Sequence, residues 1–425
     1  MASFFIPLTG LQSDSTALNT IANDLANMNT TAFKGQSVNF SDLFYQQIGS
    51  AGSGDPIQVG AGVQVSSIET AFAQGSINST GNSTDVALNG SGFFVLSNGD
   101  GEEYTRAGNF SLDSNGNLVT QNGLGVMGYP ATDGVVNTSA PLTAISVPVG
   151  QVEQPQATST FSMMTNLDAG AESGTSFPAQ VTVYDSLGIS HVATVTYTQT
   201  GTNTWSYSAA LPAADFTSGT STPVTGTMSF DSSGNLVSVT PTGGSATTVG
   251  TAAGDTSTIA VDFSGLADGA ANLGMKWNLL GSSGTPAISQ VSAASAVSST
   301  SQDGYASGQY QSFTIASDGT VSATFSNGQE KAVGQLALAN VANVQGLQML
   351  GDGDYATTIA SGTASIGTSG AAGLGTLQDG ALEESNVNIS AEFSDLIIAQ
   401  RAFEANSKAV TTFDTVTQET INMIH

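Results

Sequence analysis

The C-terminal end of the sequence reads ISAEFSDLIIAQRAFEANSKAVTTFDTVTQETINMI over residues 389–424. This stretch has no glycine or proline, and apolar side chains recur in it at intervals of seven residues. Such spacing is typical of a helix that packs against another helix. We therefore predict a helix roughly 50 Å long, capped by Asn388 or Ser390. The apolar positions of its stripe are Ile389, Phe393, Leu396, Phe403, Val410 and Ile424.

A shorter segment near the other end has the same character. No glycine or proline occurs from Leu11 to Lys34. Five apolar residues at spacings of seven predict a second helix with a coiled-coil seam of about three heptads. Three asparagines four residues apart lie on another side, where they form either a polar packing face or an ordinary solvated one. The seam residues are Leu11, Leu18, Ile21, Leu25 and Met28, and the asparagines are Asn19, Asn23 and Asn27.

The two predicted helices differ in length, and this determines what each must pack against. A single long helix exposes an apolar stripe that it cannot bury alone. The N-terminal helix is the obvious partner, but it is shorter, so part of the C-terminal stripe needs another copy of the chain. The alternative is that both helices pack on a β core of the same chain.

Composition restricts the class of protein. The chain has 425 residues, a formal net charge of −27 and no cysteine. So acidic a surface repels nucleic acids and anionic lipids, and neither is expected as a partner. Without cysteine there are no disulfides or thiolate ligands, and two histidines are too few for a three-histidine metal site. No apolar run reaches the ~18 residues of a membrane span, and the first residues lack the basic and apolar regions of a secretory signal peptide.

The region between the helical ends holds nearly all of the 50 glycines, which predicts turn-rich β structure. Residues 92–96 read as a buried strand. Around Val195 and Trp205, apolar residues alternate with Ser and Thr, which predicts half-buried antiparallel strands. Turn units with Asp, Asn and Gly predict hairpins; they follow Phe110, Phe230 and Phe313.

Changes in composition predict the domain boundaries. Linkers rich in Gly, Ser, Ala, Pro or Gln are expected at residues 49–54, 147–155, 292–301 and 362–375. These linkers nest symmetrically along the chain. We therefore expect the outer β regions to form one discontinuous domain, with residues 150–298 inserted as another.

No residue pattern in the sequence predicts an active site. Asp113, Asn115 and Asn117 begin like a calcium loop, but Leu118 stands where that loop needs glycine, so a hairpin turn is the better interpretation. His191 lies beside Ser190 without the surroundings of a catalytic triad. We accordingly predict no catalytic residue, no cofactor, no metal ligand and no enzymatic activity.

Several segments together resemble the flagellar rod–hook family of axial proteins. Residues 18–34 are similar to that family's helix-and-turn signature, with Ala32 where the family more often has Gly. Residues 92–96, 104–118 and 125–129 are similar to its shared β domain. Residues 385–390 and 398–408 resemble its C-terminal helix.

The resemblance implies a mixed, multi-domain fold in which helical coiled-coil ends enclose two mainly antiparallel β domains. Its expected parts are an inner helical assembly domain of residues 1–70 and 376–425, a middle β domain of residues 71–147 and 299–375, and an outer β domain of residues 148–298. The outer insertion resembles that of hook subunits, so a distal rod subunit is the nearest alternative.

A hook subunit implies a homopolymer that couples motor and filament. Its expected partners are the rod below, the hook–filament junction proteins above and the hook cap during assembly. The resemblance also implies an extracellular location, reached through the flagellar type III apparatus without a cleaved signal peptide. A secreted carbohydrate-binding or adhesive β module remains an alternative of a different class, although Trp205 and Trp277 lie in no evident aromatic cluster.

Overall fold

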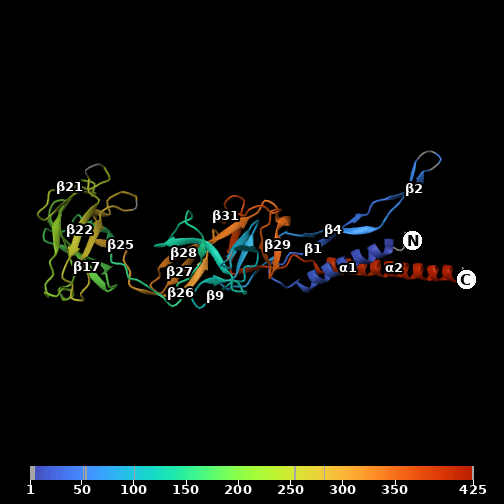
Figure 1. Ribbon diagram of the computed structural model, residues 1–425. Helices are drawn as coiled ribbons and strands as arrows, with labels where there is room; N and C mark the ends of the chain where they lie inside the picture. Colours follow the sequence, from blue (N-terminus) through green and yellow to red (C-terminus); the bar gives the residue numbers. More distant parts are fainter. Residues whose placement is uncertain are drawn as a thin grey trace. The chain divides into compact units, whose positions relative to one another are not determined.

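The computed structural model describes residues 5–423 apart from residues 51, 53, 54, 100, 253, 254 and 282 (Figure 1). The described part is mostly β-sheet and has one long helix near each end, which confirms the predicted mixed fold with helical ends. The chain forms two compact units. Unit 1 comprises Met1–Val149, Ser312–Thr324 and Glu330–His425, and unit 2 comprises Gly150–Gln311 and Phe325–Gln329.

Two antiparallel helices form one part of unit 1, α1 (Phe5–Ala26) and α2 (Ile389–Asn422) (Figure 1). Asn388 caps α2, as predicted, because its side chain accepts hydrogen bonds from Ser390 N and Ala391 N. Helix α1 begins six residues before the predicted Leu11. Pro7 falls in its first turn, where proline is tolerated. Gly10 lies against α2, where an added Cβ would be 2.6 Å from Asn406 Nδ2.

Unit 1 also contains most of the short strands. Its strands are β1 (Gln36–Asp42), β2 (Gln46–Ser50), β3 (Pro56–Val59), β4 (Val63–Thr70), β5 (Ile77–Ser79), β6 (Val86–Asn89), β7 (Phe93–Ser97), β8 (Glu102–Thr105), β9 (Ser111–Leu112), β10 (Leu118–Val119), β11 (Gly125–Thr132), β12 (Val135–Val136), β13 (Thr143–Ala144), β28 (Glu330–Asn340), β29 (Gln348–Gly351), β30 (Asp354–Ala356), β31 (Ser365–Thr368), β32 (Thr376–Asp379) and β33 (Ala381–Glu383), with the short helix η2 (Val344–Gly346). Strand β26 (Gly308–Ile315) ends in this unit, and nearly all of β27 (Thr320–Phe325) lies in it.

The segment after α1 is a long hairpin. Strand β1 pairs antiparallel with β4, and β2 pairs antiparallel with β3 beyond them. The predicted linker at residues 49–54 falls at the β2–β3 turn, where residues 51, 53 and 54 lie outside the described part. Helix α1 contacts this hairpin, since Val63 N donates to Thr9 Oγ1 at 3.3 Å and Gln36 N donates to Asp24 Oδ2 at 2.7 Å.

A larger β-sheet with its own core forms another part of unit 1, beside the two-stranded sheets β32-β6 and β33-β5. Strands β27, β28, β11, β7, β8, β30 and β29 are neighbours in that order. Residues 93–96 of β7 are all buried, as the sequence predicted. The turn at Asp113 joins β9 to β10, which pair at Leu112 and Leu118. One part of the core consists of Phe93, Val95, Tyr104, Ala337, Ala339, Val341 and Tyr355.

Unit 2 contains two sheets that share one core. Its elements are β14 (Val152–Glu153), β15 (Thr160–Asp168), β16 (Ser176–Tyr184), β17 (Ser190–Gly201), β18 (Thr204–Ala210), η1 (Ala213–Asp215), β19 (Val224–Phe230), β20 (Leu236–Pro241), β21 (Thr247–Thr248), β22 (Thr258–Phe263), β23 (Leu273–Asn278), β24 (Ile288–Val291) and β25 (Ala296–Gln302). One sheet has the order β16-β17-β18-β19-β20-β21 and is antiparallel throughout. In the other, β15 is parallel to β23 and β24 and antiparallel to β25.

Alternation of buried and less buried residues creates the core of unit 2. On β17 the inward residues are buried and the outward ones are half-buried or exposed, as predicted for the residues around Val195. Trp205 and Trp277 are both buried in this core. The Trp277 ring stacks on Phe161 at 6.0 Å, and the Tyr207 ring meets Trp277 edge-on at 5.6 Å. The tryptophans therefore belong to a sheet-on-sheet interior.

The predicted linker at residues 292–301 is wrong for most of its length. Residues 296–302 form β25, which pairs with β15 from Asn166 to Phe161. Ser and Ala made this segment look like a flexible connection. Hydrogen bonding to the edge of β15 satisfies its backbone without large side chains, so composition alone could not identify it.

Candidate assembly surface

The terminal helices meet along a row of small side chains. The buried residues of α1 are Pro7, Gly10, Ser13, Ala17, Thr20 and Asp24, at spacings of three or four. On α2, Ala399 is buried, and Ala402 and Asn406 are half-buried. Asn406 Nδ2 donates to Asp14 Oδ2 at 2.8 Å. The helices thus pack closely through residues that the heptad pattern did not include.

The predicted heptad residues flank this row. Leu11, Leu18, Ile21, Leu25, Leu396 and Val410 are half-buried, and Met28, Ile389, Phe393 and Phe403 are exposed. Met28 follows the end of α1, and Ile424 lies outside the described residues. Ile21 and Ala399 help to line a groove of about 390 Å³ between α1, α2 and β1. The role of these residues in assembly stays a prediction.

The heptad pattern missed the packed row because it gives weight to large apolar residues. Helices also pack through Gly, Ala, Ser and Thr when these recur on one face, because small side chains let the backbones approach. A search of residues 7–24 for small residues at spacings of three and four would have found this row.

Exposed aromatic side chains are confined to the two ends of the chain. Among the described residues, every exposed Phe, Tyr or Trp belongs to α1, α2 or the β1–β4 hairpin segment. We call them the terminal aromatics: Phe5, Phe40, Phe44, Tyr45, Phe393, Phe403 and Phe413. In addition, every described residue of α2 from Thr411 onward is exposed. Exposed apolar surface of this kind is typical of a surface that binds another protein.

The asparagines of α1 have different environments. Asn19 and Asn23 are exposed, and Asn27 is half-buried just beyond the helix end. Asn27 Nδ2 donates to Asn23 O at 2.9 Å, and Thr30 Oγ1 donates to Asn27 Oδ1 at 3.1 Å. Asn27 therefore helps to end α1, while Asn19 remains available at the surface.

A buried ion cluster joins three distant segments of unit 1. We call Lys34, Arg106 and Glu383 the buried clasp. Lys34 Nζ lies 2.6 Å from Glu383 Oε1, and Arg106 Nη1 lies 3.3 Å from Glu383 Oε2; the side chains of Lys34 and Glu383 are fully buried. Lys34 Nζ also donates to Ala73 O at 2.9 Å. The clasp fixes the segments after α1 and before α2 to the sheet.

Burial in the clasp shifts the pKa of its lysine. Burial lowers the pKa of Lys34 overall, although the hydrogen bond and charge of Glu383 act to raise it. Asn386 also joins the segment before α2 to the segment after α1. Gly35 N donates to its Oδ1 at 2.9 Å, and its Nδ2 donates to Ala71 O at 2.6 Å. The sequence indicated the segments of Lys34, Arg106 and Asn386 by resemblance, but it did not single out Glu383. A buried lysine needs an acidic partner, and only tertiary contact identifies which one.

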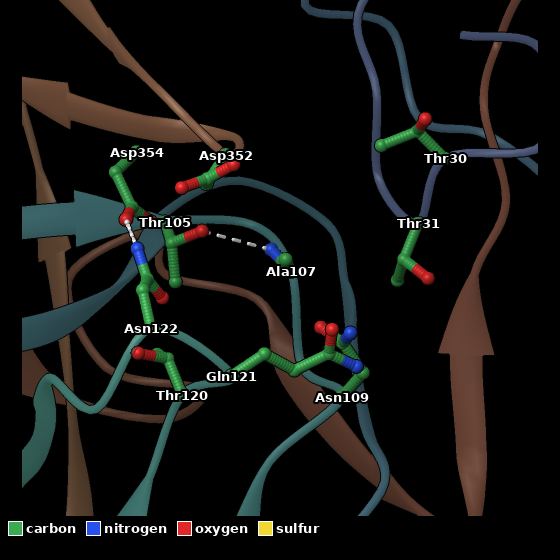
Figure 2. Close-up of a pocket in the computed structure, with 10 residues that line it drawn as sticks. All are labelled: Thr30, Thr31, Thr105, Ala107, Asn109, Thr120, Gln121, Asn122, Asp352 and Asp354. Carbon is green, nitrogen blue, oxygen red and sulfur yellow. Dashed lines mark hydrogen bonds between the residues drawn. The ribbon is translucent and has the colours of Figure 1, made fainter.

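A polar pocket of about 530 Å³ lies elsewhere in unit 1 (Figure 2). Hydroxyl, amide and carboxylate groups line it, among them Thr30, Thr105 and Asp354. Asn122 Nδ2 donates to Asp354 Oδ2 at 3.1 Å. Burial raises the pKa of Asp354, although hydrogen bonds from Asn122 and Thr105 act to lower it. The described lining has hydrogen-bonding groups but no histidine, lysine or arginine.

The residues considered for chemistry have structural partners. Asp113 Oδ1 accepts hydrogen bonds from Asn115 N and Asn117 N, both at 2.8 Å, so its carboxylate stabilises the predicted turn. Both ring nitrogens of His191 face carboxylates and not Ser190. Within the described residues, no helix has the length and apolar character that a membrane crossing requires.

Comparisons with known proteins agree along the chain. Three family models match: "Flagellar hook protein FlgE/F/G D1 domain" at residues 87–165, "Flagellar basal body protein FlaE D2 domain" at residues 156–305, and "Flagellar basal body rod FlgEFG protein C-terminal" at residues 378–423. The chain is 36% identical to the flagellar hook protein FlgE of Treponema pallidum, covering 100% of this chain and 99% of the relative. It is 34% identical to the FlgE of Escherichia coli K12, covering 99% and 100%.

A solved structure has the same fold in part. The crystal structure of the Helicobacter pylori flagellar hook protein FlgE2 superimposes with a TM-score of 0.54 at 16% identity, covering 72% of this chain and 100% of that one. Terminal helices with exposed apolar residues, joined by β units that match these models, define an axial protein of the bacterial flagellum. The full-length relatives specify the class further. The chain belongs to the flagellar hook protein family, which is structural and non-enzymatic.

Proposed function

We propose that this subunit polymerises into the hook by burying its terminal aromatics against other copies of the chain. The observation that supports this most is their distribution, because the exposed aromatic residues of the described chain all lie near its ends. A fully buried Phe contributes roughly 1.5–3 kcal/mol relative to an exposed one. Several such residues per subunit can offset the cost of ordering and association.

The half-buried heptad residues complete this proposed surface. Leu18, Ile21 and Leu25 on α1 are not fully covered by α2, so they retain apolar area for a neighbouring copy. Phe393 and Phe403 on α2 supply larger exposed groups. The proposal therefore uses the predicted assembly residues as contacts between subunits, while the small-residue row holds α1 to α2 within one.

We also propose a layered arrangement in the polymer. Residues 1–70 and 376–425 would form the inner tube, residues 71–147 and 299–375 the middle layer, and residues 148–298 the outer layer. The rod below, the junction proteins above and the hook cap would be the partners. Export through the flagellar type III apparatus without a cleaved signal peptide would bring the subunit to this extracellular location. Separate family models for residues 87–165 and 156–305 support treating these regions as distinct domains.

The experiment compares polymerisation of the wild type with a Phe403→Asp/Phe413→Asp variant. Little more than a third of each ring is exposed in the single chain, so losing the burial of both on assembly should raise the critical concentration at least about 10-fold, since each 1.4 kcal/mol is a factor of ten. Sedimentation measures this concentration, and electron microscopy shows whether tubes form. Ile359→Asp is the matched control, because Ile359 is 105% exposed but lies in neither helix. Wild-type assembly by the double variant would contradict the proposed surface.

A deletion tests the proposed outer layer separately. Gln156 and Tyr305 form an antiparallel bridge, so a short Gly-Ser link can replace residues 156–305 without stretching the chain. We expect this variant to polymerise, because it keeps both helices and the hairpin segment. Complete loss of tubes, with the remaining β-sheet folded by circular dichroism, would contradict the outer placement.

A further inference from the structure

Three loops of unit 2 bring one histidine and three carboxylates together. Asp185 precedes β17, His191 is the second residue of β17, Asp215 ends η1, and Asp268 lies between β22 and β23. His191 Nδ1 is 2.9 Å from Asp215 Oδ2. On the other side of the ring, Nε2 is 3.3 Å from Asp185 Oδ2 and 3.4 Å from Asp268 Oδ2. The His191 side chain is 5% exposed and that of Asp185 is fully buried.

The loops hold two carboxylate oxygens toward Nε2. Leu187 N and Ile189 N donate to Asp185 Oδ1 at 2.8 and 2.9 Å. Ala270 N donates to Asp268 Oδ1 at 2.9 Å. These bonds use one oxygen of each carboxylate and leave both Oδ2 atoms directed at the ring. The ligand-type atoms of Asp185, His191 and Asp268 all lie within 4.8 Å of one another.

The two sides of the imidazole differ in geometry. The Nδ1–Asp215 distance of 2.9 Å is that of an ordinary hydrogen bond. The Nε2 distances of 3.3 and 3.4 Å exceed the usual range, so a proton on Nε2 would make at most a long hydrogen bond shared between the two oxygens. The same distances equal the spacing of ligand atoms around a tetrahedral ion, which is about 3.3–3.5 Å for bonds of about 2.0–2.2 Å.

Charge provides an independent argument. Lys276 is the only Lys or Arg in residues 150–311 and 325–329, and no ion pair among the described residues joins it to these carboxylates. A protonated His191 balances one of the three negative charges. A divalent cation beside a neutral imidazole balances two, and it removes the repulsion between Asp185 and Asp268.

We propose that Asp185, His191 and Asp268 bind a divalent transition metal of the zinc type. The two Oδ2 atoms and Nε2 are the ligands, and a water takes the fourth position of a tetrahedral site. Asp215 is a positioning residue, because its hydrogen bond to Nδ1 orients the ring and presents Nε2 as a lone-pair donor. The ion joins the loop at 185–189 to the loop at 266–271 and so stabilises one end of unit 2. The nitrogen ligand favours zinc over calcium or magnesium, which prefer oxygen.

The test is a titration of the full-length monomer, freed of metal by a chelator, with Zn²⁺ followed by calorimetry. We expect one ion per chain, with affinity at least 100-fold weaker in Asp268→Asn and His191→Gln. Asp215→Asn should weaken binding about 10–100-fold, as is typical for a residue that orients a ligand. His425→Ala removes the only other histidine, and Asp231→Asn alters a half-buried turn carboxylate of the same unit; both controls should bind like the wild type.

A second measurement needs no variant. Co²⁺ added to the wild-type chain should give the intense visible absorption of a tetrahedral complex, and Zn²⁺ should abolish it. The proposal is overturned if the wild type binds no Zn²⁺, in which case the cluster holds a proton only. It is equally overturned if Asp268→Asn binds like the wild type, or if the Co²⁺ spectrum is the weak one of an octahedral ion.

Discussion

Unit 2 and the terminal helices differ in the burial of their aromatic side chains. In unit 2, Trp205, Trp277, Tyr197 and Tyr207 are buried between two sheets. On α2, Phe393 is 53% exposed, and Phe413 lies where every neighbouring described residue is exposed as well. Two sheets can cover each other's apolar faces within one chain. A pair of helices that meets along small residues leaves its large ones uncovered.

The difference separates a domain that is complete in one chain from a segment that needs other copies. Stability of unit 2 depends on its own core, so changes there should affect the monomer. The terminal aromatics contribute little until a neighbouring subunit covers them. Substitutions of similar size in the two regions should therefore have separate effects on folding and on assembly.

The largest effect is expected from Trp277→Ala in unit 2. Removing this fully buried ring leaves a cavity and should lower the free energy of unfolding by about 3–5 kcal/mol. Guanidinium unfolding followed by the fluorescence of Trp205, then the only tryptophan, measures the change. Phe413→Ala on α2 is the matched change and should alter monomer stability by less than ~0.5 kcal/mol. Equal losses of unfolding free energy in both variants would contradict the expected difference between unit 2 and the terminal helices.

The next largest effect is expected at the buried clasp. Glu383→Gln leaves the buried charge of Lys34 without its partner and should cost about 3 kcal/mol. Proteolysis of the segments before α2 and after α1 should accelerate with it, and urea unfolding measures the stability loss. Glu384→Gln is the control, because that neighbouring side chain is exposed. A loss confined to unit 2 would show that the clasp does not join the ends to the sheet.

A pH-dependent effect of moderate size is expected at Asp303. Burial acts to raise the pKa of Asp303, but hydrogen bonds from Ser159 and Thr160 lower it overall. Its stabilising contribution is present above the unfolded pKa of ~3.9 and is lost as pH falls through the lower folded value. Asp303→Asn should therefore cost about 1 kcal/mol at neutral pH, after solvent screening. The cost should become progressively smaller as the pH falls below ~3.9.

Thermal unfolding of wild type and Asp303→Asn at several pH values measures this difference. Asp262→Asn, at an exposed position on β22, is the control. A difference that grows on acidification would have the wrong sign for the proposed hydrogen bonds.

The smallest effect is expected from Ala32→Gly. Ala32 has φ 55°, a conformation that glycine adopts without strain, and it is 4% exposed beside the clasp. Relief of this strain, less the added freedom of glycine in the unfolded chain, should stabilise unit 1 by about 0.5–1 kcal/mol. Ala22→Gly, inside α1, should instead destabilise it by about 1 kcal/mol. Changes of the same sign in both variants would contradict this explanation.

Local patterns predicted much of the β structure. Alternation around Val195 and Trp205 identified β17 and β18, and the turns with Asp, Asn and Gly identified hairpins such as β9–β10. These succeed because neighbouring residues alone determine which side of a strand faces inward and where a chain can reverse. The start of α1 was missed because proline and glycine were treated as breakers. Pro7 and Gly10 are accommodated by the first turn and by close contact with α2.

The sequence by itself determined the helical ends, the turn-rich middle and the family, since each depends on local periodicity or on motifs within short segments. Tertiary structure alone decided which side of α1 meets α2, that residues 296–302 form an edge strand, and that Lys34 pairs with Glu383. It also brought Asp185, His191, Asp215 and Asp268 to one place. The reason is physical: packing and ion pairing depend on distances between residues remote in the chain, and these distances follow from the fold and not from local spacing.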